Sequence, residues 1–581
     1  MLHTISSRLS KGMLRLAVIV TVVFLTMLVA SQSHWSRDTA QAQGEGEKAQ
    51  AFEARAAGGT LVQAEFTDQP TKIKKQQKKQ LKRAMKKSHR DGPPVSENLS
   101  AEAPPGEGLP ETLIELAPEA ANTFTIFRNT TLPVGGVGGS WGNVSNTQEP
   151  STGANGKNVF QTGNWYATRS LNNGSTWTYV NPNTIFGNHP TGNIAFCCDQ
   201  VTLYDPIHDR QWWVLQYGVG NAGQGGLKIA NSSGTSLFGS WCYYNINATW
   251  FGYANATDAG IDYNDMAVSK NYLWISSNLF PAAGGKLSGI LKLPIDPMLT
   301  CGGLSYWRWT DTTHFTFKLI QGAHTTMYWG SNWANTGGWT CTGCSNGNAF
   351  RVYAWPENSN SISWWDRGVA AFVFYTRNSG QNCGSASGIV KNWCQFADSR
   401  VLGGALSEGV LHFTFNARQT TNRPFPYTRW LRFRESDKGY IGYWDLFAQW
   451  GAMQFLSISP NNDGSIGGTF SWGGGTGTTN YYPGGALLLN DDYTTDVGNS
   501  WANGISFFLN GGGNPCTSQG FYRWGDYLTT RPYYPAGYAF IAANYAIKGA
   551  NCGSAGWYSE PHNVIFGRGR DQAQYDRWKN Q

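Results

Sequence analysis

The sequence predicts an all-β protein whose long C-terminal part closes into a β-propeller of four-stranded blades. Gly accounts for 71 residues and Trp for 26, whereas only 14% of the 581 residues are charged. Short aromatic strands joined by glycine-rich turns have this composition, and helices with charged outer faces do not. A similar unit also recurs every ~50–70 residues, the length that four strands and their loops require.

Each recurring unit begins with a strand of small or polar residues and returns as a strongly apolar strand. Five clear starts are Cys198–Pro206, Asp262–Ser269, Gly322–Trp329, Ser399–Ala405 and Arg523–Thr530, and two further units open near Glu149 and Gly451. Small residues suit the crowded innermost strand of a blade, and bulky apolar residues suit the sandwiched second strand. We therefore expect seven blades. Six blades are the alternative count, and a pair of two-sheet sandwiches is the alternative fold.

The two ends of this region predict how the ring closes. Thr123–Asn129 has the pattern of an isolated strand before the first unit, and Asn563–Gly569 ends the last unit. Pairing these segments would complete the final blade with strands from both termini and cover otherwise open sheet edges.

The N-terminus predicts export from the cytoplasm. Arg8, Lys11 and Arg15 precede the apolar run Leu16–Ala30. A basic stretch followed by an apolar run of this length is typical of a secretory signal peptide, here residues 1–31. The alternative is an uncleaved N-terminal anchor, although a spanning helix usually needs about 20 apolar residues. Either way, we expect a secreted, cell-surface or periplasmic protein.

Three further segments differ in composition. Residues 32–118 are rich in Ala, Gln, Glu and Lys and end with several prolines, so we expect a disordered tether. Its basic run, Lys72–Lys87, would bind anionic surface polymers or lipid headgroups electrostatically. The alternative is a solvated run of charges without a binding role. Residues 119–571 form the expected propeller domain, and residues 572–581 form a C-terminal tail. The net charge of +7 is small for this length and does not imply nucleic acid.

The ten cysteines fit an oxidising compartment. Their order along the chain suggests the local pairs Cys197 with Cys198, Cys242 with Cys301, Cys341 with Cys344, Cys383 with Cys394, and Cys516 with Cys552. Other pairings are open from sequence alone. The pair Cys341 and Cys344 has the spacing of half a zinc site, but no second pair completes one. If the adjacent Cys197 and Cys198 bond to each other, they form a ring whose apolar face could stack against a sugar. Alternatively, each cysteine forms a disulfide with a neighbouring blade.

One short motif carries a family resemblance. Ser170–Trp177 resembles the Asp-box of the sialidase-like (BNR-repeat) propellers, with Asn172 where the family has Asp. The resemblance implies a propeller fold and places this motif at the turn between the outer strands of a blade. It does not imply sialidase activity. Arg128 lies in the region of that family's first arginine, but the expected Ile-Pro does not follow, and Arg400 and Arg523 do not make a triad.

Candidate site residues stand at the starts of the expected inner strands, where propellers usually meet their ligands. As catalytic carboxylates we list Asp199, Asp265 and Asp526; as ligand-binding residues we list Glu149, Asp262, His324, Arg400 and Arg523. Glycoside cleavage typically uses two carboxyl groups. Each residue also has a structural interpretation, because Asp often caps turns and His often satisfies a buried hydrogen bond. The sequence requires no cofactor and indicates no metal ligand set; a structural cation in the channel is the open alternative.

Three classes of function remain open from sequence alone. The first is a secreted propeller that cleaves extracellular glycans as a hydrolase or lyase. The second is a non-catalytic, lectin-like binding module, and the third is a structural or protein-interaction propeller. No nucleotide-binding loop, nucleophile elbow or zinc-hydrolase motif is present. We expect an extracellular glycan or cell-surface polymer as partner, membrane contact only through an uncleaved N-terminal segment, and a monomer.

Overall fold

The computed structural model describes residues 47–63, 123–133, 147–218, 224–233, 240–335, 338–494, 503–549, 552, 554 and 556–579. The chain divides into two units, 1–46 and 47–581, and the following description concerns the second. The predicted signal peptide and the basic run Lys72–Lys87 lie outside the described residues. No helix among the described residues is long and apolar enough to cross a membrane.

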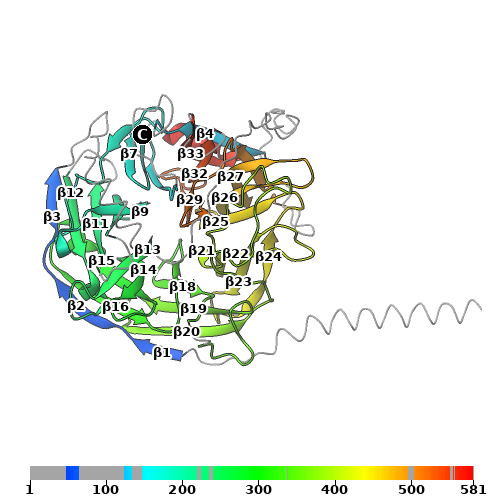
Figure 1. Cartoon of the computed structure of the whole chain (residues 1–581). Coiled ribbons are helices and arrows are strands. Elements are labelled where there is room, and N and C mark those ends of the chain that lie inside the picture. Colours follow the sequence, from blue (N-terminus) through cyan, green and yellow to red (C-terminus); the bar gives the residue numbers. More distant parts are fainter. Residues whose placement is uncertain are drawn as a thin grey trace, which may run out of the picture. The chain divides into compact units, whose positions relative to one another are not determined.

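Within the described residues, seven antiparallel sheets of four or five strands form a ring, which is a seven-bladed β-propeller (Figure 1). Blade I contains β5 (Ser151–Asn155), β6 (Asn158–Gly163), β7 (Tyr166–Ser170) and β8 (Thr178–Val180). Blade II contains β9 (Phe196–Asp205), β10 (Arg210–Tyr217), β11 (Gly226–Ser233) and β12 (Ser240–Ile246). Blade III contains β13 (Ala259–Val268), β14 (Tyr272–Pro281), β15 (Leu287–Pro294) and β16 (Leu304–Asp311).

The remaining four blades follow the same order. Blade IV contains β17 (Lys318–Leu319), β18 (Thr326–Ser331), β19 (Ala349–Pro356) and β20 (Ser361–Gly368). Blade V contains β21 (Val401–Ser407), β22 (Val410–Ala417), β23 (Tyr427–Arg434) and β24 (Tyr440–Leu446). Blade VI contains β25 (Ala452–Pro460), β26 (Ile466–Gly474), β27 (Tyr481–Asn490) and β28 (Ile505–Leu509). Blade VII contains β31 (Thr529–Pro532), β32 (Phe540–Lys548), β33 (Tyr558–Arg568) and β4 (Phe124–Thr131). The predicted blade count of seven is confirmed.

Strand β4 closes the ring, as the sequence predicts. It pairs antiparallel with β33 from His562↔Thr131 to Arg568↔Phe124. Phe124 and Ile126 pack against a buried cluster that includes Phe540 and Phe566. The outermost strand of the last blade therefore comes from the N-terminal side of the domain, so neither end of the ring leaves an open blade.

Residues 47–63 depart from the predicted tether, which spanned 32–118. They form β1 (Glu47–Gln50), β2 (Phe52–Ala56) and β3 (Thr60–Gln63), which we call the belt. The belt adds a fifth, antiparallel strand to the outer edges of blades IV, III and II in turn (Figure 1). A sheet edge offers unpaired N–H and C=O groups to any extended chain, so a segment of polar composition can be ordered there without a core of its own.

All five predicted disulfide pairs are present. They join Cys197 to Cys198, Cys242 to Cys301, Cys341 to Cys344, Cys383 to Cys394, and Cys516 to Cys552. No cysteine among the described residues is free. Cys341 and Cys344 are therefore a disulfide and not half of a zinc site. Disulfides persist in oxidising compartments, which agrees with the predicted export.

Hydrogen bonds join the inner strands of neighbouring blades around the ring. The backbone N–H of Thr202 donates to Ser151 Oγ at 3.0 Å, and that of Thr530 donates to Ser457 Oγ at 3.1 Å. The N–H of Leu319 likewise donates to Asp265 Oδ2 at 3.0 Å. Each of these bonds gives a partner to a backbone N–H at the inner edge of β9, β31 or β17.

The segment that resembles an Asp-box forms the turn between β7 and β8, the outer strands of blade I. Ser170 Oγ accepts a hydrogen bond from Gly174 N at 2.7 Å, and Asn172 Oδ1 accepts one from Thr176 N at 2.8 Å. Asn172 therefore holds the turn through its amide oxygen. Gly174 has a φ of +80°, which glycine adopts without strain.

Short elements complete the domain. They are the hairpin β29 (Thr517–Ser518) and β30 (Phe521–Tyr522), the helices α3 (Ile295–Leu299) and α4 (Gln572–Trp578), and the 3-10 turns η2 (Thr191–Asn193), η3 (Ala248–Phe251) and η4 (Gly569–Asp571). Helix α4 lies in the predicted C-terminal tail. Its Tyr575 is buried, stacks on Phe127 and accepts a hydrogen bond from Asn173 Nδ2 at 2.6 Å. This part of the tail is thus attached to the propeller.

Candidate functional site

The inner strands are irregular near their N-terminal ends. In blade II, residues 197–199 of β9 lie opposite the single residue Gln216 of β10. In blade III, Tyr263 and Asn264 of β13 lie opposite Ser277. Both are β-bulges, which bend a strand, release residues from regular pairing and redirect their side chains. All inner strands run in the same sense through a propeller, so these bulges gather at one face of the ring.

Two buried carboxyl groups meet at this face. Glu149 precedes β5 in blade I, and Asp199 lies in the bulge of β9 in blade II. The two side chains hydrogen-bond to each other. Burial, reinforced by the charge of Glu149, raises the pKa of Asp199 well above its ordinary value. Asp199 is therefore the member of the pair that keeps its proton to the higher pH, and it is the donor in the hydrogen bond to Glu149.

Glu149 has its own set of donors. Its Oε2 accepts from Asn164 Nδ2 at 2.8 Å, and its Oε1 accepts from Arg523 Nη2 at 3.1 Å and from the backbone N–H of Asp526 at 3.0 Å. Its side chain has no exposed surface. Burial raises the pKa of Glu149, whereas the charge of Arg523 opposes that shift. The carboxyl that contacts cationic and backbone donors is thus Glu149, and the carboxyl that carries the proton is Asp199.

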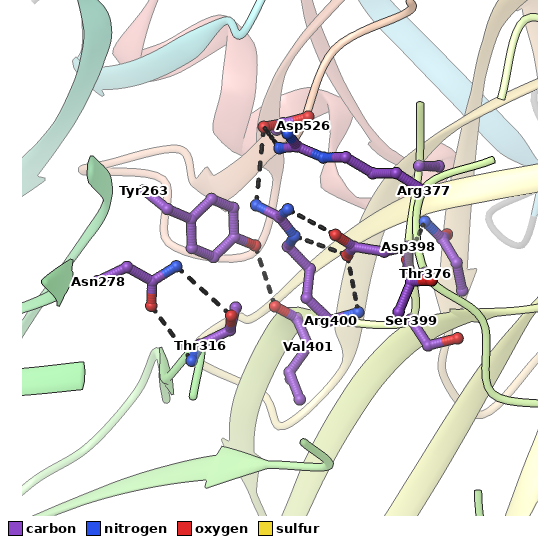
Figure 2. A network of polar contacts seen from close by, with 12 residues as sticks. Tyr263, Asn278, Thr316, Thr376, Arg377, Asp398, Ser399, Arg400, Val401 and Asp526 are labelled. Carbon is purple, nitrogen blue, oxygen red and sulfur yellow. Dashed lines mark hydrogen bonds and ion pairs between the residues drawn. The ribbon is translucent and has the colours of Figure 1, made fainter. Parts of the chain in front are cut away.

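Three arginines converge on a third carboxylate. Asp526 Oδ2 lies 3.4 Å from Arg523 Nη2, 3.6 Å from Arg400 Nη1 and 3.8 Å from Arg377 Nη2. Figure 2 shows Arg377 and Arg400 reaching Asp526 from the blade V side. Burial alone would raise the pKa of Asp526, but the three guanidinium groups outweigh it and hold that pKa below its usual range. Asp526 is therefore ionised, in contrast to Asp199.

The arginines are held by further contacts. Arg400 forms a bidentate ion pair with Asp398, with Nε–Oδ1 at 2.7 Å and Nη2–Oδ2 at 2.6 Å (Figure 2). Its guanidinium also lies 4.5 Å from the centre of the Tyr263 ring. Arg377 lies 4.0 Å from the centre of the Phe396 ring, and its side chain is 42% exposed. Arg377 is thus the cation of this group that is most accessible to a ligand.

Tyr263 has a strained backbone in the bulge of β13. Its φ is +52°, a region that bulky side chains rarely adopt. Its hydroxyl donates to the backbone carbonyl of Val401 at 3.1 Å, a bond visible in Figure 2. Non-glycine residues in this conformation persist only where the surroundings enforce them, and they cluster at functional sites.

The structure thus brings together six of the eight residues that the sequence suggested, which are Glu149, Asp199, Asp262, Arg400, Arg523 and Asp526. Asp262 is half-buried, and its Oδ1 accepts from Gln216 Nε2 at 3.2 Å and from the N–H of Tyr263 at 2.8 Å. It therefore anchors the β13 bulge. The charge of Asp262 also acts on Asp199 and raises the pKa of that residue further.

Asp265 and His324 do not join this group. Asp265 lies three residues further along β13, forms a 2.8 Å ion pair with Lys318 and accepts the N–H of Leu319. These contacts make it a link between blades III and IV, so we do not retain it as a catalytic carboxylate. His324 is exposed in the turn between β17 and β18, at the opposite end of an inner strand.

Sequence reasoning missed Arg377, Phe396 and Asp398. All three lie in the long connection between β20 and β21, outside any recognisable strand. The Asp398-Ser-Arg400 spacing was a weak signal, because an Asp two residues before an Arg can pair with it. Nothing in the sequence around Arg377 indicated a role at this site, because its distance to Asp526 depends on how blades V and VII are placed.

Among the described residues, no group of three or more His, Cys, Asp or Glu side chains is arranged to hold a metal ion. The cluster at this face instead combines cations with carboxyl groups. What it offers chemically is a carboxyl with a raised pKa, Asp199, a carboxyl with a lowered pKa, Asp526, and the partly exposed guanidinium of Arg377.

No family model matches the sequence, and no curated protein is similar to it in sequence. Solved structures with similar backbones include the polysaccharide lyase Uly1, at 9% identity and a TM-score of 0.35, which covers 88% of this chain and 100% of that one. A subtype N10 neuraminidase-like protein of A/little yellow-shouldered bat/Guatemala/060/2010 has 8% identity and a TM-score of 0.30, covering 60% of this chain and 96% of that one.

An α-L-arabinanase of Penicillium chrysogenum, solved with arabinobiose, is also similar. It has 10% identity and a TM-score of 0.26, and the match covers 64% of this chain and 93% of that one. At these TM-scores, none of the three assigns a substrate or a reaction to this chain.

Proposed function

We propose that the face formed by the N-terminal ends of the inner strands binds an extracellular glycan and cleaves a glycosidic bond. One observation carries the proposal: neighbouring carboxyl groups have pKa values displaced in opposite directions. The pKa of Asp199 is raised and that of Asp526 is lowered. Pairs of carboxyl groups whose environments separate their pKa values are typical of acid and base assignments in enzymes.

In this proposal, Asp199 is the general acid. Its proton would go to the glycosidic oxygen as the bond to the departing sugar breaks. Glu149 orients Asp199 by accepting its hydrogen bond, and it has no exposed surface through which to touch a substrate. Asp526 is the ionised partner, which would activate water or stabilise the developing positive charge on the sugar ring.

The arginines favour an acidic glycan over a neutral one. Arg400 and Arg523 also pair with Asp398 and Glu149, whereas Arg377 pairs with Asp526 at 3.8 Å and its side chain is 42% exposed. The planar guanidinium of Arg377 could donate hydrogen bonds to a carboxylate or sulfate on the ligand. Arg377→Ala is therefore expected to weaken the binding of acidic glycans and to leave neutral ones unaffected.

A non-catalytic binding module is the second candidate, and a specific observation favours it. Asp526, Asp398 and Glu149 all have their charges paired within the protein, by Arg523, Arg400 and Arg377. Such a network can simply lock blades I, V and VII together. In that case the face would bind a ligand through Arg377 without turning it over.

The test is a screen of acidic and neutral polysaccharides for binding and for product formation, with the full-length chain and Asp199→Asn. Asp437→Asn is the matched control, because Asp437 is exposed and its carboxylate contacts the exposed Arg434 and the backbone N–H of Gly439, away from the candidate site. Loss of a general acid should lower kcat by ~10²–10⁴-fold with binding retained. Binding without turnover in the parent chain would favour the second candidate, and turnover that survives Asp199→Asn would exclude Asp199 as the acid.

A further inference from the structure

The disulfide between the adjacent residues Cys197 and Cys198 lies next to Asp199, and a contribution to stability does not explain this position. Their disulfide joins neighbouring residues, so it closes a ring through one peptide bond and spans no loop. The stabilisation that a disulfide gives through chain entropy grows with the length of the loop it closes, so this one contributes little in that way. Its location must be explained differently.

The ring lies in the bulge that carries Asp199. Regular pairing of β9 with β10 stops at Gln200↔Leu215 and resumes at Phe196↔Tyr217. The intervening residues 197–199 lie opposite the single residue Gln216, so they lack the ladder that fixes backbone angles elsewhere in the strand. Two of the three released residues are the bonded cysteines, and the third is Asp199.

Both sides of this bulge are anchored. On one side, Cys197 is buried and follows Phe196, whose ring packs edge-on against Tyr217 at 6.0 Å. On the other side, Gln200 Nε2 donates to the carbonyls of Gly163 and Tyr166 at 2.6 and 2.9 Å. Between these anchors, the covalent ring directly precedes Asp199 in the segment that lacks regular pairing.

We propose that the Cys197–Cys198 disulfide is a positioning element that holds the carboxyl of Asp199 against Glu149. The disulfide ring reduces the number of backbone conformations open to residues 197–199. It thereby keeps the side chain of Asp199 oriented toward Glu149. The catalytic meaning of this arrangement rests on the function proposed above. The positioning itself does not, because it is a property of the unliganded protein.

The test measures the protonation of Asp199 directly. Infrared difference spectra across pH 4–9 report the C=O stretch of a protonated carboxyl, and the band of Asp199 is identified by its loss in Asp199→Asn. The full-length chain is compared with Cys197→Ser/Cys198→Ser. The matched control is Cys341→Ser/Cys344→Ser, which removes another short-range disulfide, located between β18 and β19.

We expect the double variant at 197 and 198 to lose the Asp199 band at neutral pH, with its midpoint falling toward the ordinary aspartate value of about 3.9. The control should keep the band. An unchanged band in the folded 197/198 variant would overturn the proposal. A second variant, Cys197→Ala/Cys198→Ala, places no hydroxyl at the buried position. If both variants unfold, the proposal is also overturned, because the disulfide would then be needed for the stability of the whole blade.

Turnover adds an independent readout. If the chain cleaves a glycan, the 197/198 variant should lose kcat with little change in KM, because the acid is misplaced and the binding groups are not. If no glycan is cleaved, the infrared spectra still test whether the disulfide positions Asp199. Failure of the proposed function is thus distinguishable from failure of this inference.

Discussion

Asp199 and Glu149 form a hydrogen bond between two buried carboxyl groups that belong to different blades. Asp199 carries the proton, and Glu149 faces Arg523 and the backbone N–H of Asp526. The pair therefore joins blade I, blade II and the segment before β31. It combines a structural contact with a group able to donate a proton.

The first prediction separates the two members of this pair. Asp199→Asn should leave the free energy of unfolding at pH 7 unchanged or higher, because burial disfavours the charged form of Asp199 and an amide carries no charge. Glu149→Gln should lower that free energy by ~1–3 kcal/mol, because the neutral amide no longer offsets the charge of Arg523 and has one accepting oxygen in place of two. Denaturant unfolding at pH 7 checks both. Equal losses in the two variants would contradict this division of roles.

The second prediction concerns acid stability. Burial, aided by the charge of Lys228, lowers the pKa of His189 to about 4. As the pH falls below about 6.5, the unfolded chain binds a proton that the folded protein excludes. The free energy of unfolding should thus fall by up to ~3 kcal/mol between pH 6.5 and pH 4 on account of this residue.

His189→Gln should make that decline shallower, and denaturant unfolding at a series of pH values measures it. His324→Gln is the matched control, since His324 is exposed. A profile for His189→Gln that runs parallel to that of the parent chain would show that His189 does not contribute.

The third prediction concerns closure of the ring. Deletion of residues 120–131 removes β4 and leaves β33 as an open edge. It also exposes the apolar surface that Phe124 and Ile126 cover. We expect a sharply lower melting temperature and a cooperative loss of near-UV circular dichroism. A melting temperature equal to that of the parent chain would show that β4 is not needed to close the propeller.

The fourth prediction concerns the belt. Deletion of residues 47–63 should uncover β12, β16 and β20 and speed amide hydrogen exchange in those strands, while β24 and β28 stay unchanged. The uncovered edges should also promote concentration-dependent association, measured by light scattering. Phe52→Ser is the control, because Phe52 is 64% exposed and its side chain adds little to the pairing. Unchanged exchange after the deletion would refute a protective role.

The sequence by itself determined the features that depend on local pattern. The alternation of small, polar and apolar strands fixed the blade architecture, because each strand's burial is visible in its own residues. The order of the cysteines along the chain predicted all five disulfides, and the strand at 123–129 predicted closure because it lacked a local partner.

The tertiary structure decided which distant groups meet. Residues 47–63 look like a polar tether, and they become strands only because three sheet edges lie in line beside them. Arg377 reaches Asp526, and Asp199 meets Glu149, only after seven blades close into a ring. Asp265 sits three residues from Asp262 in the same strand, yet the two have different roles, because a bulge lies between them and Lys318 pairs with only one. Contacts across a ring depend on how the blades are placed relative to one another, and no single stretch of sequence encodes that placement.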